Sequence, residues 1–146
     1  MAKAQSGRFV VLEGIDGVFH LAAQPGVRAS WGFGFDVYVH NNIRATQRLF
    51  EAASASGVRV TFASSSSVYG DAESYPTRED ATRMPVSPYG ITKMTCEELA
   101  RVYSRSFGLE VAALRYFTVY GPRQRPDMAF ARIVRGLIAE TPFLVL

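Results

Sequence analysis

Short apolar runs rich in β-branched residues alternate with longer amphipathic stretches along most of this chain. The short runs are 18–23, 58–64 and 111–116, and the longer stretches are 36–55, 88–107 and 128–139. This alternation is typical of parallel strands joined by crossover helices. The sequence therefore predicts an α/β fold, a parallel sheet with flanking helices.

Local signals set the expected helix ends. Ser87 can cap a helix and Pro88 suits its first position, because that position needs no backbone N–H. Gly57 and Gly108 follow the last periodic residues of two stretches, where glycine commonly ends a helix. We therefore expect helices over 36–55 and 88–107.

Composition excludes several classes of function. The 146 residues suit one domain over 1–146, and their net charge of +3 comes from 16 basic and 13 acidic residues without a basic run. We expect no nucleic-acid partner, no metal site and, since no long apolar run is present, no membrane span. The single cysteine, Cys96, favours a reducing cytoplasmic location.

Tyr89 and Lys93 are four residues apart in a predicted helix, so both side chains emerge on one face. A phenol has a pKa of about 10, and a nearby ammonium stabilises its ionised form. A serine at the end of a strand, such as Ser65, can bind the same substrate hydroxyl. These three residues form a candidate acid–base site, although the Tyr-x-x-x-Lys spacing alone is common on solvated helix faces.

Four segments occur in the order of a known family. They are His20-Leu21-Ala22-Ala23, Ser64 to Gly70 (SSSSVYG), Ser87 to Lys93 (SPYGITK) and Leu114 to Pro122 (LRYFTVYGP). As a set they resemble the NAD-dependent epimerase/dehydratase family, extended short-chain dehydrogenases that act on nucleotide sugars. The resemblance implies a Rossmann-type domain and NAD as cofactor.

The resemblance also implies roles for individual residues. Tyr89 becomes the catalytic acid/base, Lys93 orients the nicotinamide ribose and lowers the tyrosine pKa, and Ser65 assists, with Ser64 and Ser66 as alternatives to Ser65. The implied cofactor contacts are Leu21, Ala22, Ala23, Asn42, Ser64, Lys93, Tyr116 and Phe117. The implied substrate contacts are Arg28, Ser66, Ser67, Thr118 and Arg125.

Two positions bear on the reaction. Family members that dehydrate the sugar carry acidic residues after the catalytic serine or threonine, where this chain has Ser66 and Ser67. A UDP-sugar 4-epimerase is therefore favoured over a 4,6-dehydratase. The segment Arg115 to Phe130, which includes Thr118 and Arg125, looks most like UDP-glucuronate 4-epimerases. A substrate with a carboxylate is consistent with this resemblance, because arginine binds carboxylates through paired hydrogen bonds. UDP-glucose, whose sugar carries no charge, is the alternative substrate. Arg125 could instead belong to a structural turn and make no substrate contact.

Other features argue for a partial domain. No glycine-rich Gly-x-x-Gly-x-x-Gly turn precedes residue 18, and the C-terminal substrate region of the family is also missing. An inactive remnant of the family is therefore the second interpretation. Residues 9–17 also resemble the start of a nucleotide kinase, but the Gly-Lys-Ser/Thr that a P-loop needs does not follow them in this chain. We expect the strand at 18–23 to have an exposed edge, covered by an 8–12 hairpin or by self-association.

Overall fold

The computed structural model describes residues 12–142. The chain divides into two compact units, Met1–Tyr116 and Phe117–Leu146, and each is described by itself. The expectation of a single domain over 1–146 stays a prediction for the chain as a whole. Residues 8–11 of the expected hairpin lie outside the described residues.

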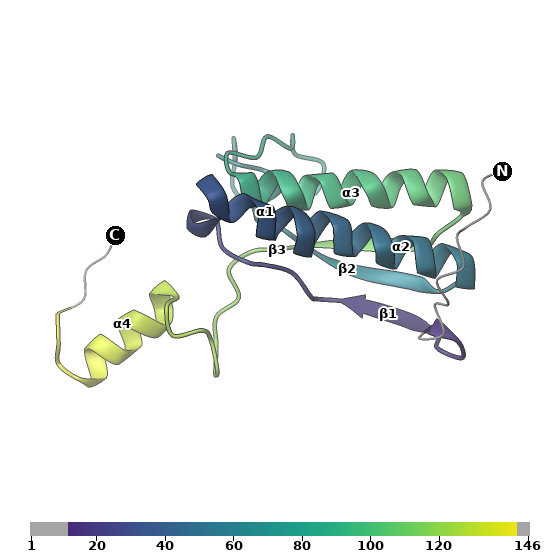
Figure 1. Ribbon diagram of the computed structural model, residues 1–146. Helices are drawn as coiled ribbons and strands as arrows, with labels where there is room; N and C mark the ends of the chain where they lie inside the picture. The colour runs from purple at the N-terminus through teal and green to yellow at the C-terminus, as the bar shows by residue number, and fades with distance from the viewer. Residues whose placement is uncertain (1–11, 143–146) are drawn as a thin grey trace. The chain divides into compact units, whose positions relative to one another are not determined.

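The first unit is built on a three-stranded parallel sheet (Figure 1). Its strands are β1 (Gly17–His20), β2 (Arg59–Ser65) and β3 (Val111–Tyr116), in the spatial order β1-β2-β3. The register pairs Val18 with Val60, and Val60 with Val111. The predicted α/β fold with a parallel sheet is confirmed. Because the strands are parallel, the carboxyl ends of all three lie on the same side of the sheet. β1 is shorter than expected, because 21–23 leave the sheet as a loop.

The helices of this unit follow the expected caps. Two single turns, η2 (Arg28–Ser30) and η3 (Gly32–Gly34), lead into α1 (Phe35–Tyr38), the π-helical segment η4 (Val39–Arg44) and α2 (Ala45–Ser56). Gly57 ends α2 with a φ of 67°, in the left-handed region where glycine has no Cβ penalty. A further turn, η5 (Ser66–Val68), follows β2, and α3 (Pro88–Phe107) precedes β3.

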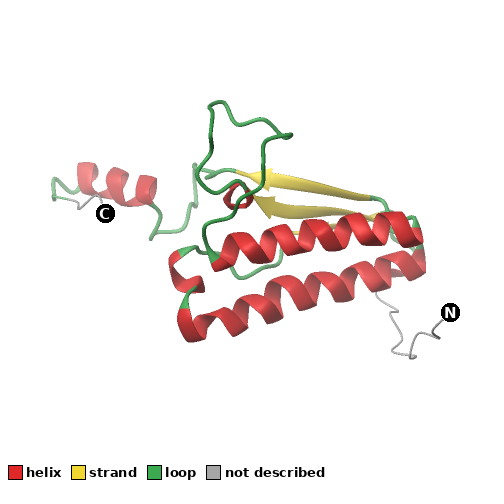
Figure 2. Ribbon diagram, turned by 90° about the horizontal axis from the view of Figure 1, so that it is seen from above, coloured by secondary structure: helices red, strands yellow, loops and turns green. Residues whose placement is uncertain are grey.

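The hydrophobic core lies between the sheet and the two long helices. Figure 2 shows α2 and α3 side by side along one face of the sheet. Phe50 on α2 is completely buried, and its ring packs against Phe62 on β2 and Tyr103 on α3 at centroid distances of 6.3 and 6.0 Å. Burial of aromatic side chains of this size stabilises the packing of the helices on the sheet.

Within the described part of the first unit, the opposite face of the sheet carries no helix. Phe19 and Leu114 on that face are 79% and 41% exposed. β1 lies at an edge of the sheet, as expected, and among residues 12–116 its ladder partner is β2 alone. Self-association through this edge stays a prediction.

The second unit contains α4 (Ala129–Ile138), one residue shorter at each end than the predicted stretch. Phe130, Val134 and Ile138 recur every four residues and are at least half exposed. The ring of Phe130 packs on that of Tyr120 at 5.3 Å. None of the helices in the described part of the chain combines the length and apolar character needed to cross a membrane.

Candidate active site

The first turn of α3 presents Tyr89. Ser87 Oγ accepts a hydrogen bond from the Gly90 backbone N–H at 3.1 Å, the predicted N-cap. Gly90 packs so closely that a Cβ there would lie 2.5 Å from the Ser67 carbonyl oxygen. The absence of a side chain at Gly90 therefore brings the start of α3 against η5, directly after β2.

Lys93 is almost fully buried, with 3% of its surface exposed. Its Nζ donates to the Ala63 carbonyl at 2.8 Å and lies 5.0 Å from the ring centroid of Phe62 and 5.9 Å from that of Tyr89. Burial lowers the pKa of Lys93, because the charged ammonium is poorly solvated there. An ammonium has three donors, and the described residues supply one hydrogen-bond acceptor.

Tyr89 is half-buried and packs edge-on against Tyr38 of α1, with ring centroids 6.1 Å apart. Burial raises the pKa of Tyr89, while a hydrogen bond with Ser65 lowers it in part. The pKa of Tyr89 is thus raised overall and not lowered as expected, because burial is the largest effect on it. The Lys93 ammonium donates instead to the Ala63 carbonyl. The structure thus joins Ser65, Tyr89 and Lys93 in one cluster.

The serines after β2 have distinct surroundings. Ser65 is buried, and its Oγ accepts from the Ser67 backbone N–H at 3.2 Å, which caps η5. Ser64 Oγ donates to Glu97 Oε1 at 2.5 Å, so its hydroxyl faces α3. Ser66 and Ser67 are half-buried beside this turn. Of the three candidates, Ser65 is the serine that affects Tyr89, because it lowers the Tyr89 pKa in part.

The loop after β1 is held by Asn42, which is 1% exposed. Its Oδ1 accepts from the Gln24 N–H at 2.7 Å, while its Nδ2 donates to Gln24 O and Thr92 Oγ1, both at 3.1 Å. Asn42 therefore shapes the loop that carries Leu21, Ala22 and Ala23. It lies in η4, and π-helical segments often occur at functional sites. No pattern in the sequence indicates this segment.

The remaining predicted contacts lie at the surface. Arg28 and Tyr116 are exposed in the first unit, at η2 and at the end of β3. Phe117, Thr118 and Arg125 are exposed in the second unit, and Arg125 Nη2 forms an ion pair with Asp127 Oδ2 at 2.6 Å.

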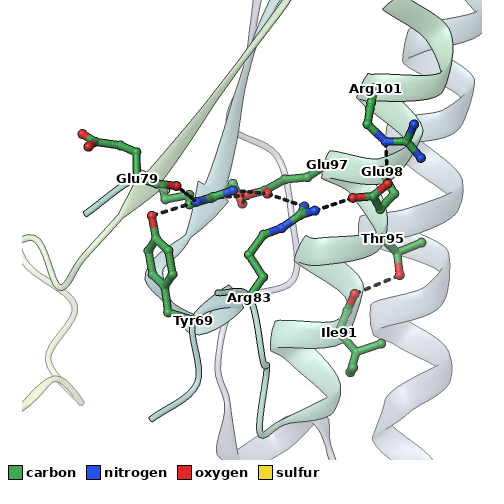
Figure 3. A network of polar contacts seen from close by, with 10 residues as sticks. Tyr69, Glu79, Arg83, Ile91, Thr95, Glu97, Glu98 and Arg101 are labelled. Carbon is green, nitrogen blue, oxygen red and sulfur yellow. Dashed lines mark hydrogen bonds and ion pairs between the residues drawn. The ribbon is translucent and has the colours of Figure 1, made fainter. Parts of the chain in front are cut away.

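Sequence reasoning missed a buried carboxylate one turn beyond Lys93. Glu97 is 7% exposed and forms ion pairs with Arg83 and Arg115 at 3.1 and 2.9 Å (Figure 3). Burial alone would raise the pKa of Glu97, but hydrogen bonds from Arg115, Ser64 and Arg83 lower it overall. A glutamate four residues after Lys93 on a helix was the available signal.

The cluster has the groups that proton transfer to a sugar hydroxyl requires. A phenol, a serine hydroxyl and a buried ammonium converge where parallel strands end, the position at which open α/β sheets bind ligands. Exposed apolar side chains, Leu21 and Tyr116, stand at the ends of β1 and β3. These features suit a flat, partly apolar ligand with ribose hydroxyls.

Known proteins are similar to almost the whole chain. A UDP-glucose epimerase of Bacillus subtilis (strain 168), YtcB, named as uncharacterised, is 50% identical over 136 residues, which are 92% of this chain and 43% of that protein. The UDP-glucuronate 4-epimerase of Thermodesulfobacterium geofontis is 42% identical over 90% of this chain and 41% of its own length.

A solved structure agrees in fold. The UDP-glucuronic acid 4-epimerase from Bacillus cereus, in complex with UDP-glucuronic acid and NAD, superposes with a TM-score of 0.85 and 49% identity. The match covers 91% of this chain and 42% of that one, so the chain spans less than half the length of these relatives. The model of the NAD dependent epimerase/dehydratase family matches residues 2–146, and this chain therefore belongs to that family.

Proposed function

We propose that this chain carries the acid–base half of an NAD-dependent UDP-sugar 4-epimerase, with a UDP-hexuronate as substrate. The observation that carries the proposal is the buried Lys93 ammonium: its Nζ lies 5.9 Å from the ring centroid of Tyr89 and donates to the Ala63 carbonyl, two residues before Ser65 on β2. The similarity to UDP-glucuronate 4-epimerases supports the substrate class. We also propose a cytoplasmic location, supported by Cys96, a buried free thiol.

The residues present fit NAD. Lys93 has ammonium donors that ribose hydroxyls can use, and Leu21, Ala22 and Tyr116 offer exposed apolar surface for a nicotinamide ring. Ala23 belongs to the same loop, and Phe117 follows Tyr116 directly. NAD, when bound, would take a hydride from C4 of the sugar and return it.

Tyr89 is the group that moves the proton. As the C4–H bond breaks, the proton of the C4 hydroxyl passes to the phenolate oxygen of Tyr89, leaving a C4 ketone. On return of the hydride to the opposite face, the phenol gives the proton back to the C4 oxygen. Ser65 holds the same oxygen, and it is the group that favours the phenolate required in the first step, since it offsets part of the rise that burial causes in the Tyr89 pKa.

The residues around the sugar favour epimerisation of an acidic hexose. Ser66 and Ser67, both half-buried, follow Ser65, and neither can act as the extra acid or base that dehydration requires. We assign Arg125 to the substrate carboxylate and Thr118 and Arg28 to hydroxyl contacts. Asp127, one partner of Arg125, is exposed, and exposed ion pairs are weak enough to exchange.

A product assay tests this function. The intact protein is incubated with NAD and UDP-glucuronate, and the 4-epimer is followed by proton NMR of the anomeric signals. Tyr89→Phe should lower kcat by about 10²–10⁴-fold, because the proton-transfer group is removed. The control, Tyr75→Phe, alters a tyrosine that is 82% exposed and should leave kcat unchanged.

Cofactor binding gives a second readout. Calorimetric titration with NAD should show binding that Lys93→Ala abolishes. Turnover that survives Tyr89→Phe would refute the assigned mechanism. A protein that binds no NAD at millimolar concentration would be an inactive member of the family.

A further inference from the structure

One carboxylate collects hydrogen bonds from three segments of the first unit. Glu97 Oε1 accepts from Ser64 Oγ at 2.5 Å and from Arg115 Nε at 2.9 Å. Its Oε2 accepts from Arg115 Nη2 at 2.9 Å and from Arg83 Nη1 at 3.1 Å. Four donors occupy the roughly four lone-pair sites of a carboxylate, so Glu97 is fully coordinated.

Ser64 and Glu97 are close in sequence to residues of the candidate active site. Ser64 is the neighbour of Ser65 on β2, and Glu97 is one turn beyond Lys93 on α3. Arg115 on β3 also donates to the Tyr69 hydroxyl and to the Glu79 carbonyl, both at 2.8 Å. Figure 3 shows Glu97 between Arg83 and the Tyr69 side of this network.

We propose that Glu97 is a positioning residue: it holds the end of β2 against α3, so that the Ser65 hydroxyl meets the Tyr89 phenol beside Lys93. The inference rests on the proposed function of that cluster. Stability alone is a weak reason for such a network, because buried ion pairs can be replaced by apolar groups at little cost. A bidentate arginine and a serine on one carboxylate do define geometry, because each donor has one direction of approach.

The chain offers a matched control on the next residue. Glu98 also binds Arg83, at 2.6 Å, but it forms its second ion pair with Arg101 on the same helix, and its side chain is 38% exposed. Glu97→Gln and Glu98→Gln therefore remove the same charge from the same helix and disturb the same arginine. Only Glu97→Gln weakens the hold on Ser64 and Arg115.

Kinetics of the intact protein separate the two variants. Glu97→Gln should lower kcat by about 10- to 100-fold, as expected for a displaced catalytic group, with the substrate KM within threefold. Glu98→Gln should keep kcat within twofold. In the pH profile of kcat, the limb that Tyr89 controls should move to higher pH in Glu97→Gln, because a displaced Ser65 no longer lowers the Tyr89 pKa. The other groups that face Tyr89, Lys93 of α3 and Tyr38 of α1, are unchanged in both variants.

Two further measurements keep the result decisive. Ser64→Ala removes only the hydroxyl that Glu97 holds, and it replaces Glu97→Gln as the deciding variant if the latter does not fold. Titration of Tyr89 by NMR of tyrosine labelled with ¹³C at Cζ needs no turnover, so it decides the inference even if the intact protein proves not to be an epimerase. An unchanged kcat and an unchanged Tyr89 titration in the folded variant would overturn the proposal.

Discussion

Gly90→Ala tests how α3 is placed against the serine turn. A Cβ at this position would meet the Ser67 carbonyl oxygen at 2.5 Å and the Pro85 Cβ at 2.9 Å. Contacts below 3.0 Å force a displacement, and neither a backbone carbonyl nor a proline ring can rotate away. The change must therefore move the first turn of α3, which carries Tyr89, or the turn that follows Ser65.

Two effects of opposite sign determine the outcome. Alanine is a better helix former than glycine, which favours the variant by about 0.5–1 kcal/mol. Overpacking of a rigid contact costs about 1–3 kcal/mol, and contact with backbone puts this site in the upper part of that range. We expect the free energy of unfolding to fall by about 1–2 kcal/mol, and the melting temperature by roughly 2–8 °C.

Urea denaturation of the purified chain measures this loss of unfolding free energy. The fluorescence of the single tryptophan of the chain shows which part of the structure has moved. Trp31 lines a surface groove of about 600 Å³ together with Pro85 and Pro88, so its emission should change in Gly90→Ala. Gly57→Ala is the control, because a Cβ there meets nothing within 4 Å and only the φ of 67° is unfavourable. It should lower stability by about 1 kcal/mol without changing Trp31 emission. A Gly90→Ala chain as stable as the wild type would refute the close-packing argument.

Two other predictions concern the core and its pH dependence. Phe50→Ala should lower the free energy of unfolding by about 3–5 kcal/mol in urea denaturation, since the ring is fully buried, whereas the exposed Phe33→Ala should change it by less than about 0.5 kcal/mol. Burial, followed by the Lys93 charge, lowers the pKa of His20 below 6.5 in the folded state. The unfolded chain therefore binds the proton more readily, so stability present above pH 6.5 is lost as pH falls through the folded pKa. The free energy of unfolding of His20→Gln and of the exposed His40→Gln is compared at pH 7.5 and 5. Only His20→Gln should reduce the loss of stability at the lower pH, and equal losses in the two variants would contradict the prediction.

The order of elements and most of their ends could be predicted from the sequence. Helix periodicity, the Ser87-Pro88 start and the glycine stops are local signals, and a cap acts within one turn of the residue that makes it. The strand β3 was predicted to the residue. The end of β1 was not, because Leu21 and Ala22 are apolar enough for a strand, yet the loop is shaped by Asn42, eighteen residues after Gln24.

By itself the sequence determined the fold class, the family resemblance and the candidate cluster of Ser65, Tyr89 and Lys93, because these depend on residue identity and on spacing along one helix or strand. Only the tertiary structure decided that burial raises the pKa of Tyr89, that Ser65 is the serine that lowers it in part, and that Glu97 joins α3 to both neighbouring strands. The physical reason is distance along the chain. Desolvation and ion pairing depend on groups brought together from β2, α3 and β3, and no local pattern encodes that meeting.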